Sequence, residues 1–434
     1  MDKIRNGEIR MGQTEKKRNK WVTFIIVCMT TGVITELPYL RWALYEPLRE
    51  GLGQTNTEFG LSMSLFGVLA AILYIPGGWL ADRISHRKLF TASAVGCGVL
   101  GLWLSTMPSF TATMIIHALW AVTNIGMFWP AMTKAISLLE EREGQGKIFG
   151  LFEGVRGVFV LVMWLGLMKV FETLGGISAV IVALSVLSII TGVISFFFMA
   201  DNTGTGMTSD QSVMKDMATA LKTPSVWVVA GVIFTIYATY SASSYMQPYC
   251  ETVLGMSAVA AGYVGILRKD AIRLLGAPIS GFISEKMGGR CALLIGIFDI
   301  LFIISLAILL VLPVGAQYTV VTVVILVATS FAIYGMRGMY YAIIDEIGTP
   351  KKIYGAVAGF AMFIGFLPDA FNSTLCGYWL DAYPGAQGYR NIFIYMLVLI
   401  IVNVILIGIL LRYISKNKEQ IRKNQQELKG EVAE

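Results

Sequence analysis

Long apolar stretches recur along the whole chain and restrict its fold more than any other feature. Trp21 to Ile34, Ala179 to Met199 and Ile392 to Leu411 are examples, and an α-helix needs about 20 apolar residues to cross a bilayer. A soluble chain of 434 residues would need a far larger charged surface than 14% of Asp, Glu, Lys and Arg can supply. The sequence therefore predicts an all-α membrane protein whose surface mostly faces lipid.

Twelve transmembrane helices can be placed on these stretches. They fall at residues 21–45, 58–82, 89–107, 111–135, 147–171, 177–199, 226–249, 259–284, 290–312, 318–344, 354–380 and 389–412. The longest polar interior stretch divides them into two sets of six. We therefore expect an N-terminal six-helix bundle over 1–200, a cytoplasmic linker over 201–225, a second bundle over 226–414 and a cytoplasmic tail over 415–434.

The distribution of basic residues predicts the orientation in the membrane. Of the 34 Lys and Arg residues, 25 fall in the termini and in the loops on the same side, whereas the opposite loops hold only Arg49, Lys169 and Arg390. Cytoplasmic loops carry the excess of Lys and Arg. We therefore expect a multi-pass protein of the bacterial inner membrane, a monomer with both termini cytoplasmic. This pattern explains the net charge of +6 without a nucleic-acid partner.

Several functional classes are excluded by missing motifs. The sequence contains no GxxxxGK[ST] phosphate loop, no GxGxxG after a strand, no HExxH and no nucleophile–base pair. Its five cysteines form no CxxC pair. We expect neither an enzyme nor an ATP-driven pump, and no cofactor or metal site.

The two halves repeat a charged motif after their second span. Gly78 to Arg83 reads GWLADR with Arg87 following, and Gly281 to Lys286 reads GFISEK with Arg290 in the matching place. A carboxylate at a helix end can pair with an arginine or a helix N-terminus in one state and release it in another. The motif therefore predicts gating residues: Asp82, Arg83, Arg87, Glu285 and Arg290.

Residues 77–88, GGWLADRISHRK, resemble the loop-two signature of the major facilitator superfamily. Two six-helix repeats around a central site are typical of that fold. Residues 126–130, GMFWP, are similar to the Gly-Met-x-Trp-Pro of the organophosphate:phosphate antiporters, and GYWLD at 377–381 resembles the end of their eleventh span. The chain is also similar to enteric facilitators associated with sulfosugar use, which share the Glu-x-x-Arg-Gly pattern of the fifth span. The resemblance implies secondary transport by alternating access.

The same resemblance marks four positions. Arg156 stands where the antiporters carry a substrate-contacting histidine, and Asp270 stands on a membrane-embedded glutamate of the eighth span. Tyr240 replaces their seventh-span arginine, and their first-span arginine falls two residues before Arg41. These departures leave phosphorylated, sulfonated and carboxylated anions open as substrates.

Ionisable residues at membrane depth point to a site without reference to any family. Each costs about 2.5–3.5 kcal/mol if it faces lipid, so the set would cost about 30 kcal/mol unless its members pair or line a wet cavity. The set comprises Arg41, Arg156, Arg268, Lys269, Arg273, Arg337, Glu36, Glu153, Asp270, Asp299 and Asp369.

Helical spacing divides these residues into groups. Glu153 and Arg156 share a helix face, as do Asp270 and Arg273. Arg268 points away from the polar stripe of its span, and Asp299 has a structural role. The predicted substrate contacts are Arg41, Glu153, Arg156, Tyr240, Lys269, Asp270, Arg273 and Arg337, with Asp270 and Asp369 as coupling residues. Alternatively, Glu153 and Arg156 are a self-neutralising pair that fixes a helix.

These observations predict a secondary transporter for a small organic anion, moved by exchange or by coupling to protons or sodium, with phosphate as one possible counter-substrate. One alternative is a proton-coupled carrier of neutral sugars or drugs, with Asp369 or Asp270 as its proton site. An alternative from another class is a transporter-like membrane sensor.

Overall fold

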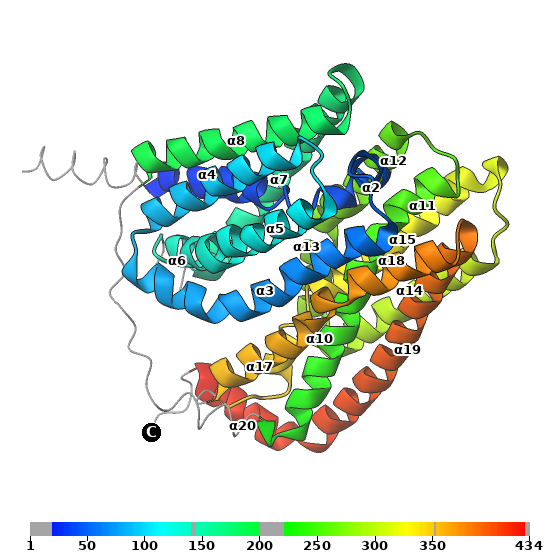
Figure 1. Ribbon diagram of the computed structural model, residues 1–434. Coiled ribbons are helices and arrows are strands. Elements are labelled where there is room, and N and C mark those ends of the chain that lie inside the picture. Colours follow the sequence, from blue (N-terminus) through cyan, green and yellow to red (C-terminus); the bar gives the residue numbers. More distant parts are fainter. Residues whose placement is uncertain (1–19, 140–144, 200–220, 351–352, 430–434) are drawn as a thin grey trace, which may run out of the picture. The chain divides into compact units, whose positions relative to one another are not determined.

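The computed structural model describes residues 20–139, 145–199, 221–350 and 353–429, and all regular structure in these ranges is helical (Figure 1). These residues form two compact units. The first contains residues 20–40 and 72–199, and the second contains 41–71 and 221–429. Helix α3 (Asn56–Arg83) contributes to both units. Most of the predicted linker falls outside the described residues.

Nine helices in the described ranges are long and apolar enough to cross a membrane. They are Asn56–Tyr74, Phe110–Ser137, Ile148–Thr173, Ile177–Phe198, Pro224–Thr252, Cys291–Val311, Ala316–Arg337, Tyr354–Ala382 and Ala386–Lys416. The other three predicted spans coincide with the shorter helix Lys20–Ile34, with α4 (His86–Leu104), and with α12 (Ala258–Ile266) followed by α13 (Ile272–Lys286). The all-helical membrane class is confirmed, while twelve spans in two six-helix bundles stay a prediction.

The first unit is built around close packing of α4 on α8 (Ile177–Phe198), which lie side by side in Figure 1. A Cβ atom on Gly98 of α4 would lie 2.6 Å from the carbonyl oxygen of Ser185. Ser188 donates its hydroxyl to the carbonyl of Ala94 at 2.8 Å. Small residues let helix backbones approach in lipid, where no hydrophobic force drives them together. The unit also contains α5 (Phe110–Trp120), the π-helical η2 (Ala121–Phe128), α6 (Trp129–Ser137) and α7 (Gln145–Thr173).

In the second unit α10 (Pro224–Ala242) packs against α17 (Tyr354–Phe366) and α19 (Ala386–Lys416), while α15 (Thr319–Arg337) packs against α13 and α14 (Cys291–Val311). Its remaining elements are η1 (Leu40–Trp42), α2 (Tyr45–Gly51), α11 (Met246–Thr252), η6 (Ala316–Tyr318), α16 (Ile343–Glu346) and α20 (Lys418–Lys429). Residue Leu40 of η1 is counted with the first unit.

Three long helices of the second unit are broken rather than continuous. Short segments interrupt them: η4 (Ser243–Tyr245) after α10, the π-helical η5 (Leu267–Ala271) between α12 and α13, and η7 (Leu367–Ala370) between α17 and α18 (Asn372–Ala382). Backbone groups freed in an apolar medium need partners within the protein. Side chains supply them, since Arg268 donates to the carbonyl of Ser243 at 3.1 Å and Asn372 donates to that of Ala238 at 2.9 Å.

Helices α3 and α18 touch almost without side chains between them. A Cβ atom on Gly60 would lie 2.2 Å from the carbonyl oxygen of Ser373, and one on Gly377 would lie 2.2 Å from that of Asn56. At the start of α3, the Asp381 carboxylate accepts the backbone N–H of Asn56 at 3.0 Å and that of Thr57 at 2.7 Å. It also accepts the side chains of the same two residues. A carboxylate from α18 therefore caps the positive end of α3.

Replacing Gly60 with alanine tests this backbone contact. We expect Gly60→Ala to lower the apparent melting temperature of the purified protein, because its Cβ atom must push α3 away from backbone atoms. The matched control is Gly408→Ala in α19, where an added Cβ meets nothing within 4 Å. Alanine is favoured over glycine inside a helix by roughly 0.5–1 kcal/mol, so the control should be neutral or stabilising. Equal shifts for the two variants in scanning fluorimetry would contradict the tight contact.

Candidate functional site

Arg337, the last residue of α15, lies against two tyrosine rings of α10. Its guanidinium carbon is 3.7 Å from the centroid of the Tyr240 ring and 5.7 Å from that of Tyr237. The two tyrosines are three residues apart and therefore share one helix face. Such cation–π contacts stabilise a cation that has left water. Arg337 Nε is buried and has no hydrogen-bond partner among the described residues.

The Tyr240 ring is enclosed by further aromatic side chains. Trp42 lies 4.9 Å from it and Tyr334 lies 5.8 Å from it, measured between ring centroids. Tyr334 precedes Arg337 by one turn of α15 and is also close enough to Asp270 and Arg273 for their charges to act on its hydroxyl. Two of the predicted contacts, Tyr240 and Arg337, therefore lie together, and the charges of two others, Asp270 and Arg273, act on the neighbouring Tyr334.

Asp369 joins this cluster through a hydrogen bond. It lies in η7, at the break between α17 and α18, and its Oδ2 accepts the hydroxyl of Tyr237 at 2.6 Å. The ring of Tyr237 in turn packs against Tyr240 at 5.7 Å. The predicted coupling residue is thus linked to the arginine of α15 through one tyrosine.

Three consecutive charged residues occupy the π-helical segment η5. Arg268, Lys269 and Asp270 are only 4%, 8% and 5% exposed, and Lys269 Nζ lies 4.0 Å from Asp270 Oδ1. Arg268 is directed elsewhere, because its Nε donates to Ser330 Oγ at 2.9 Å and its Nη2 to the carbonyl of Ser243. It braces the break after α10, in agreement with the expectation that it points away from the polar stripe. Asp299 is held by two hydrogen bonds from Asn403.

Arg41 lies in a cage of aromatic rings. Its guanidinium carbon is 5.1 Å from the ring centroids of Tyr45, Phe59 and Tyr245, and its Nη2 donates to the Tyr245 hydroxyl at 2.7 Å. That hydroxyl donates to the carbonyl of Ser373. Arg41 is 3% exposed, and its Nε and Nη1 are buried without a hydrogen-bond partner among the described residues.

Glu153 and Arg156 form an ion pair on α7 of the first unit. Arg156 Nη2 lies 2.7 Å from Glu153 Oε2, as their spacing predicts. The side chain of Arg156 is 7% exposed and that of Glu153 is 49% exposed. The arginine is therefore fixed by a carboxylate that stays accessible. The geometry fits a substrate contact and a self-neutralising pair equally well.

Asp82, at the end of α3, forms an ion pair with Lys134 of α6. The fold brings this lysine close from 52 residues away. Pairing of Asp82 with an arginine or a helix N-terminus in another state stays a prediction. Arg83 covers the ring of Trp79 at 3.9 Å, and Arg87 lies 5.6 Å from that of Phe196.

The matching motif of the second half is arranged differently. Glu285 and Arg290 are both exposed. Arg290 acts on Glu346 of α16, whose carboxylate accepts the backbone N–H of Ala292 at 2.7 Å at the start of α14. Burial raises the pKa of the Glu346 carboxyl, while its hydrogen bonds to the backbone of Ala292 and Cys291 and the charge of Arg290 oppose that rise. The acid at a helix N-terminus is here Glu346 and not Glu285.

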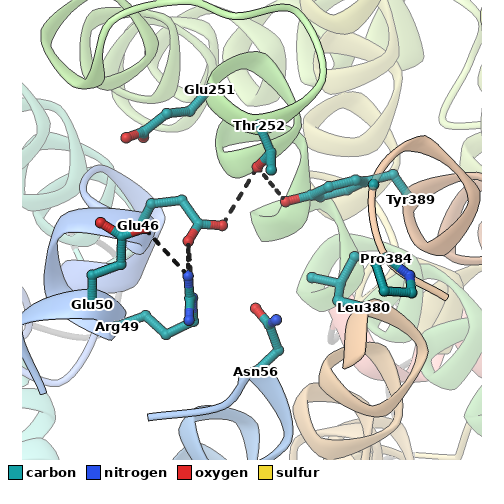
Figure 2. Close-up of a pocket in the computed structure, with 10 residues that line it drawn as sticks. Glu46, Arg49, Glu50, Asn56, Glu251, Thr252, Leu380, Pro384 and Tyr389 are labelled. Atoms are coloured by element: carbon teal, nitrogen blue, oxygen red, sulfur yellow. Dashed lines mark hydrogen bonds and ion pairs between the residues drawn. The ribbon is translucent and has the colours of Figure 1, made fainter. Parts of the chain in front are cut away.

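A separate cavity of about 310 Å³ opens beside α2 in the second unit (Figure 2). Glu46 lies between Arg49, whose Nη2 is 2.7 Å away, and Thr252, whose hydroxyl is 3.4 Å away and also contacts the hydroxyl of Tyr389 (Figure 2). The cavity is lined by Glu46, Arg49, Glu50, Asn56, Glu251, Thr252, Leu380, Pro384, Gly385 and Tyr389. Three carboxylates face one guanidinium, so this lining disfavours an anion.

Sequence reasoning missed three residues that shape these sites. Tyr334 lies one turn from Arg337, so helical spacing could have indicated it. Trp42 adjoins Arg41, but nothing in the sequence links it to Tyr240. Asp381 was noted within GYWLD, yet its role at the start of α3 depends on packing between distant segments.

Residues 21–373 match the Major Facilitator Superfamily. Because this match covers most of the chain, the protein belongs to this family. Members of the family are membrane transporters and not enzymes. Among its relatives, the inner membrane protein YqcE of Escherichia coli (strain K12) is 34% identical over 385 residues, which cover 86% of this chain and 91% of the relative. The inner membrane protein YihN of the same strain is 27% identical over 413 residues, covering 93% and 98%.

A solved structure confirms the fold. A bacterial homologue of the human lysosomal transporter Spinster, in an inward-facing and unoccupied conformation, has a TM-score of 0.66 at 15% identity. The match covers 94% of this chain and 98% of that chain. The major facilitator fold expected from GGWLADRISHRK is therefore confirmed.

The pairing of Asp82 predicts unequal roles for the two repeated motifs. We expect Asp82→Asn to slow transport strongly while leaving ligand affinity within a few fold, because the substitution breaks the pair with Lys134 at a helix end. Glu285→Gln, in the other copy of the motif, should slow transport less, since Glu285 is exposed. Uptake by reconstituted vesicles and equilibrium binding, both with a ligand found in the screen described below, separate the two quantities. Loss of binding in correctly folded Asp82→Asn would contradict a gating role.

Proposed function

We propose that the protein moves a small organic anion, phosphorylated, sulfonated or carboxylated, across the bacterial inner membrane by alternating access. The observation that carries this proposal is Arg337. Its guanidinium rests on the Tyr240 ring with Nε buried, and none of its nitrogens forms an ion pair with a carboxylate in the described part of the chain. An unsatisfied buried donor costs about 1–3 kcal/mol. A bound anion would remove that cost.

Arg41 supports the same substrate class. It too is enclosed by rings and leaves two nitrogens without a hydrogen-bond partner in the described residues. Guanidinium groups bind phosphate, sulfonate and carboxylate through paired donors in a planar fork. Two arginines whose buried donors are unused favour an anion over a neutral sugar.

The proposed substrate contacts of the second unit are Arg41, Tyr240, Lys269, Asp270, Arg273 and Arg337. Arg156 and Glu153, which pair on α7 of the first unit, are further proposed substrate contacts. Asp270 and Asp369 are the proposed coupling residues for H⁺ or Na⁺. Asp82, Arg83, Arg87, Glu285 and Arg290 are proposed to act in gating. We propose a monomer with both termini in the cytoplasm.

A thermal-shift screen of the purified full-length protein tests the substrate class. The probes are sugar phosphates, sulfonates and sugar acids, each paired with its neutral analogue. A ligand at 100 times its Kd adds about 2.7 kcal/mol of stability. Stabilisation by anions alone is expected, and stabilisation by the neutral partners to the same extent would overturn the proposal.

Arg337 should be needed for this stabilisation. We expect Arg337→Gln to abolish the shift given by the best anion, because the substitution removes the charge and the paired donors. Arg390→Gln is the control, since it removes one positive charge from an exposed residue at the start of α19. Both variants should unfold cooperatively without ligand. An unchanged anion shift in Arg337→Gln would exclude this residue as the binding group.

Substitutions of Arg156 test whether this residue of the first unit binds the anion or only neutralises Glu153. If it binds the anion, Arg156→Lys should stay folded and weaken binding by roughly 1.5–3 kcal/mol, the range for a hydrogen bond to a charged group. If it only neutralises Glu153, lysine should serve almost as well. Near wild-type affinity in the double variant Glu153→Gln, Arg156→Gln, measured by calorimetry, would leave Arg156 as scaffolding.

A further inference from the structure

Asp369 occupies the break in the span Tyr354–Ala382. Pro368 has no backbone N–H and cannot continue α17. The chain therefore turns through η7, and Asp369 lies within this turn. Asn372, just past the turn, donates to the carbonyl of Ala238, and the preceding residue of α10, Tyr237, donates its hydroxyl to Asp369. Two adjacent residues of α10 therefore hold the break and its carboxylate in one position.

The group that holds Asp369 also contacts Arg337. The Tyr237 ring lies 5.7 Å from the Arg337 guanidinium carbon, and the charge of Arg337 acts on the Asp369 carboxyl through space. Arg337 forms no ion pair with a carboxylate in the described ranges, and Asp369 is an acid on which its charge acts. We infer that the Asp369 charge partly offsets that of Arg337 while no anion is bound.

Helices α3 and α17 pack near Asp369 through uncharged residues. Helix α3 approaches with Gly67, where an added Cβ would lie 2.5 Å from the Asp369 carbonyl oxygen. Helix α17 contributes Phe366, whose ring packs on Tyr237 at 4.6 Å. Among the described residues, the groups that act on the Asp369 carboxyl are Tyr237 of α10, through a hydrogen bond, and Arg337 of α15, through its charge.

We propose that Asp369 is the proton-binding residue of the transport cycle, and that its protonation prepares Arg337 for the anion. A proton from water adds to the Asp369 carboxylate and gives a neutral carboxylic acid; no other bond forms or breaks except hydrogen bonds. Arg337 then loses its compensating negative charge. The link between protonation and anion binding rests on the proposed function. Protonation of Asp369 would favour binding of the anion at Arg337, so the proton and the anion would be transported together, as in symport.

Asp270 and Asp299 fit this role less well. Asp270 lies beside Lys269 in a segment with three consecutive charges, so it already has a cation to neutralise. Asp299 is fixed by two hydrogen bonds from Asn403, which also accepts from Thr235, and none of these partners belongs to the Arg337 cluster. Asp369 differs from both in accepting a hydrogen bond from a tyrosine, Tyr237, whose ring lies against Arg337.

Infrared difference spectroscopy tests the proton site without any substrate. Full-length protein in lipid vesicles is titrated, and the carbonyl stretching band of a protonated carboxylic acid is followed. We expect a titrating band that disappears in Asp369→Asn and persists in the control Asp299→Asn. Tyr237→Phe and Arg337→Gln should each keep the band and move its midpoint to higher pH, because both remove a group that stabilises the carboxylate.

The outcomes separate the two proposals. A band that persists in Asp369→Asn, or a midpoint that moves in neither Tyr237→Phe nor Arg337→Gln, would overturn the proton site even if anions bind. The two latter variants keep the test decisive should Asp369→Asn fail to fold. If the Asp369 band is found but the anion screen fails, the proton site stands and the proposed substrate class falls. If both hold, affinity for the best anion should rise tenfold or more on acidification in wild type and stay constant in Asp369→Asn.

Discussion

The placement of cations inside an apolar fold is the constraint on which the rest of this structure depends. A guanidinium group can leave water only if other groups replace its hydration. The protein does this with rings and helix breaks: Tyr240 and Tyr237 receive Arg337, an aromatic cage receives Arg41, and a carbonyl freed where α10 ends receives Arg268. Few carboxylates are used. Aromatic rings and carbonyl groups stabilise these arginines without neutralising them, whereas direct ion pairs would cancel their positive charge.

The two halves use their repeated motif in different ways. Asp82 finds Lys134 on α6, but in the second half the residue aligned with Lys134, counted from the Gly-Met pairs at 126–127 and 335–336, is Ile343. Glu285 consequently stays exposed, and Glu346 instead caps the start of α14. The two copies of the motif therefore share an acidic residue but not its partner. A movement that exposes Asp82 must break an ion pair, whereas Glu285 is already exposed.

Local sequence patterns predicted the features that lie within a single helix. Contacts between distant segments could not be predicted in this way. Apolar runs predicted the membrane helices, and the spacing of Glu153 and Arg156 predicted their ion pair. Lys134, the partner of Asp82, is 52 residues away, so no local spacing could indicate it. A regular helix was assumed for 259–284, whereas η5 is π-helical and buries three consecutive charged residues. The link from Asp369 through Tyr237 to Arg337 joins three helices, so no local spacing could show it.

The backbone contact between α3 and α18 has a consequence for how reversibly it forms. Glycine, serine and threonine surround it, and the hydroxyl of Thr374 bonds that of Ser64 at 2.8 Å. Residues of this size lose little rotamer entropy when they are buried. Parting and rejoining therefore need no search through side-chain conformations. The free-energy balance instead rests on Asp381, whose four hydrogen bonds to Asn56 and Thr57 must be exchanged for water together. The contact between α3 and α18 should therefore open and close cooperatively and with little hysteresis.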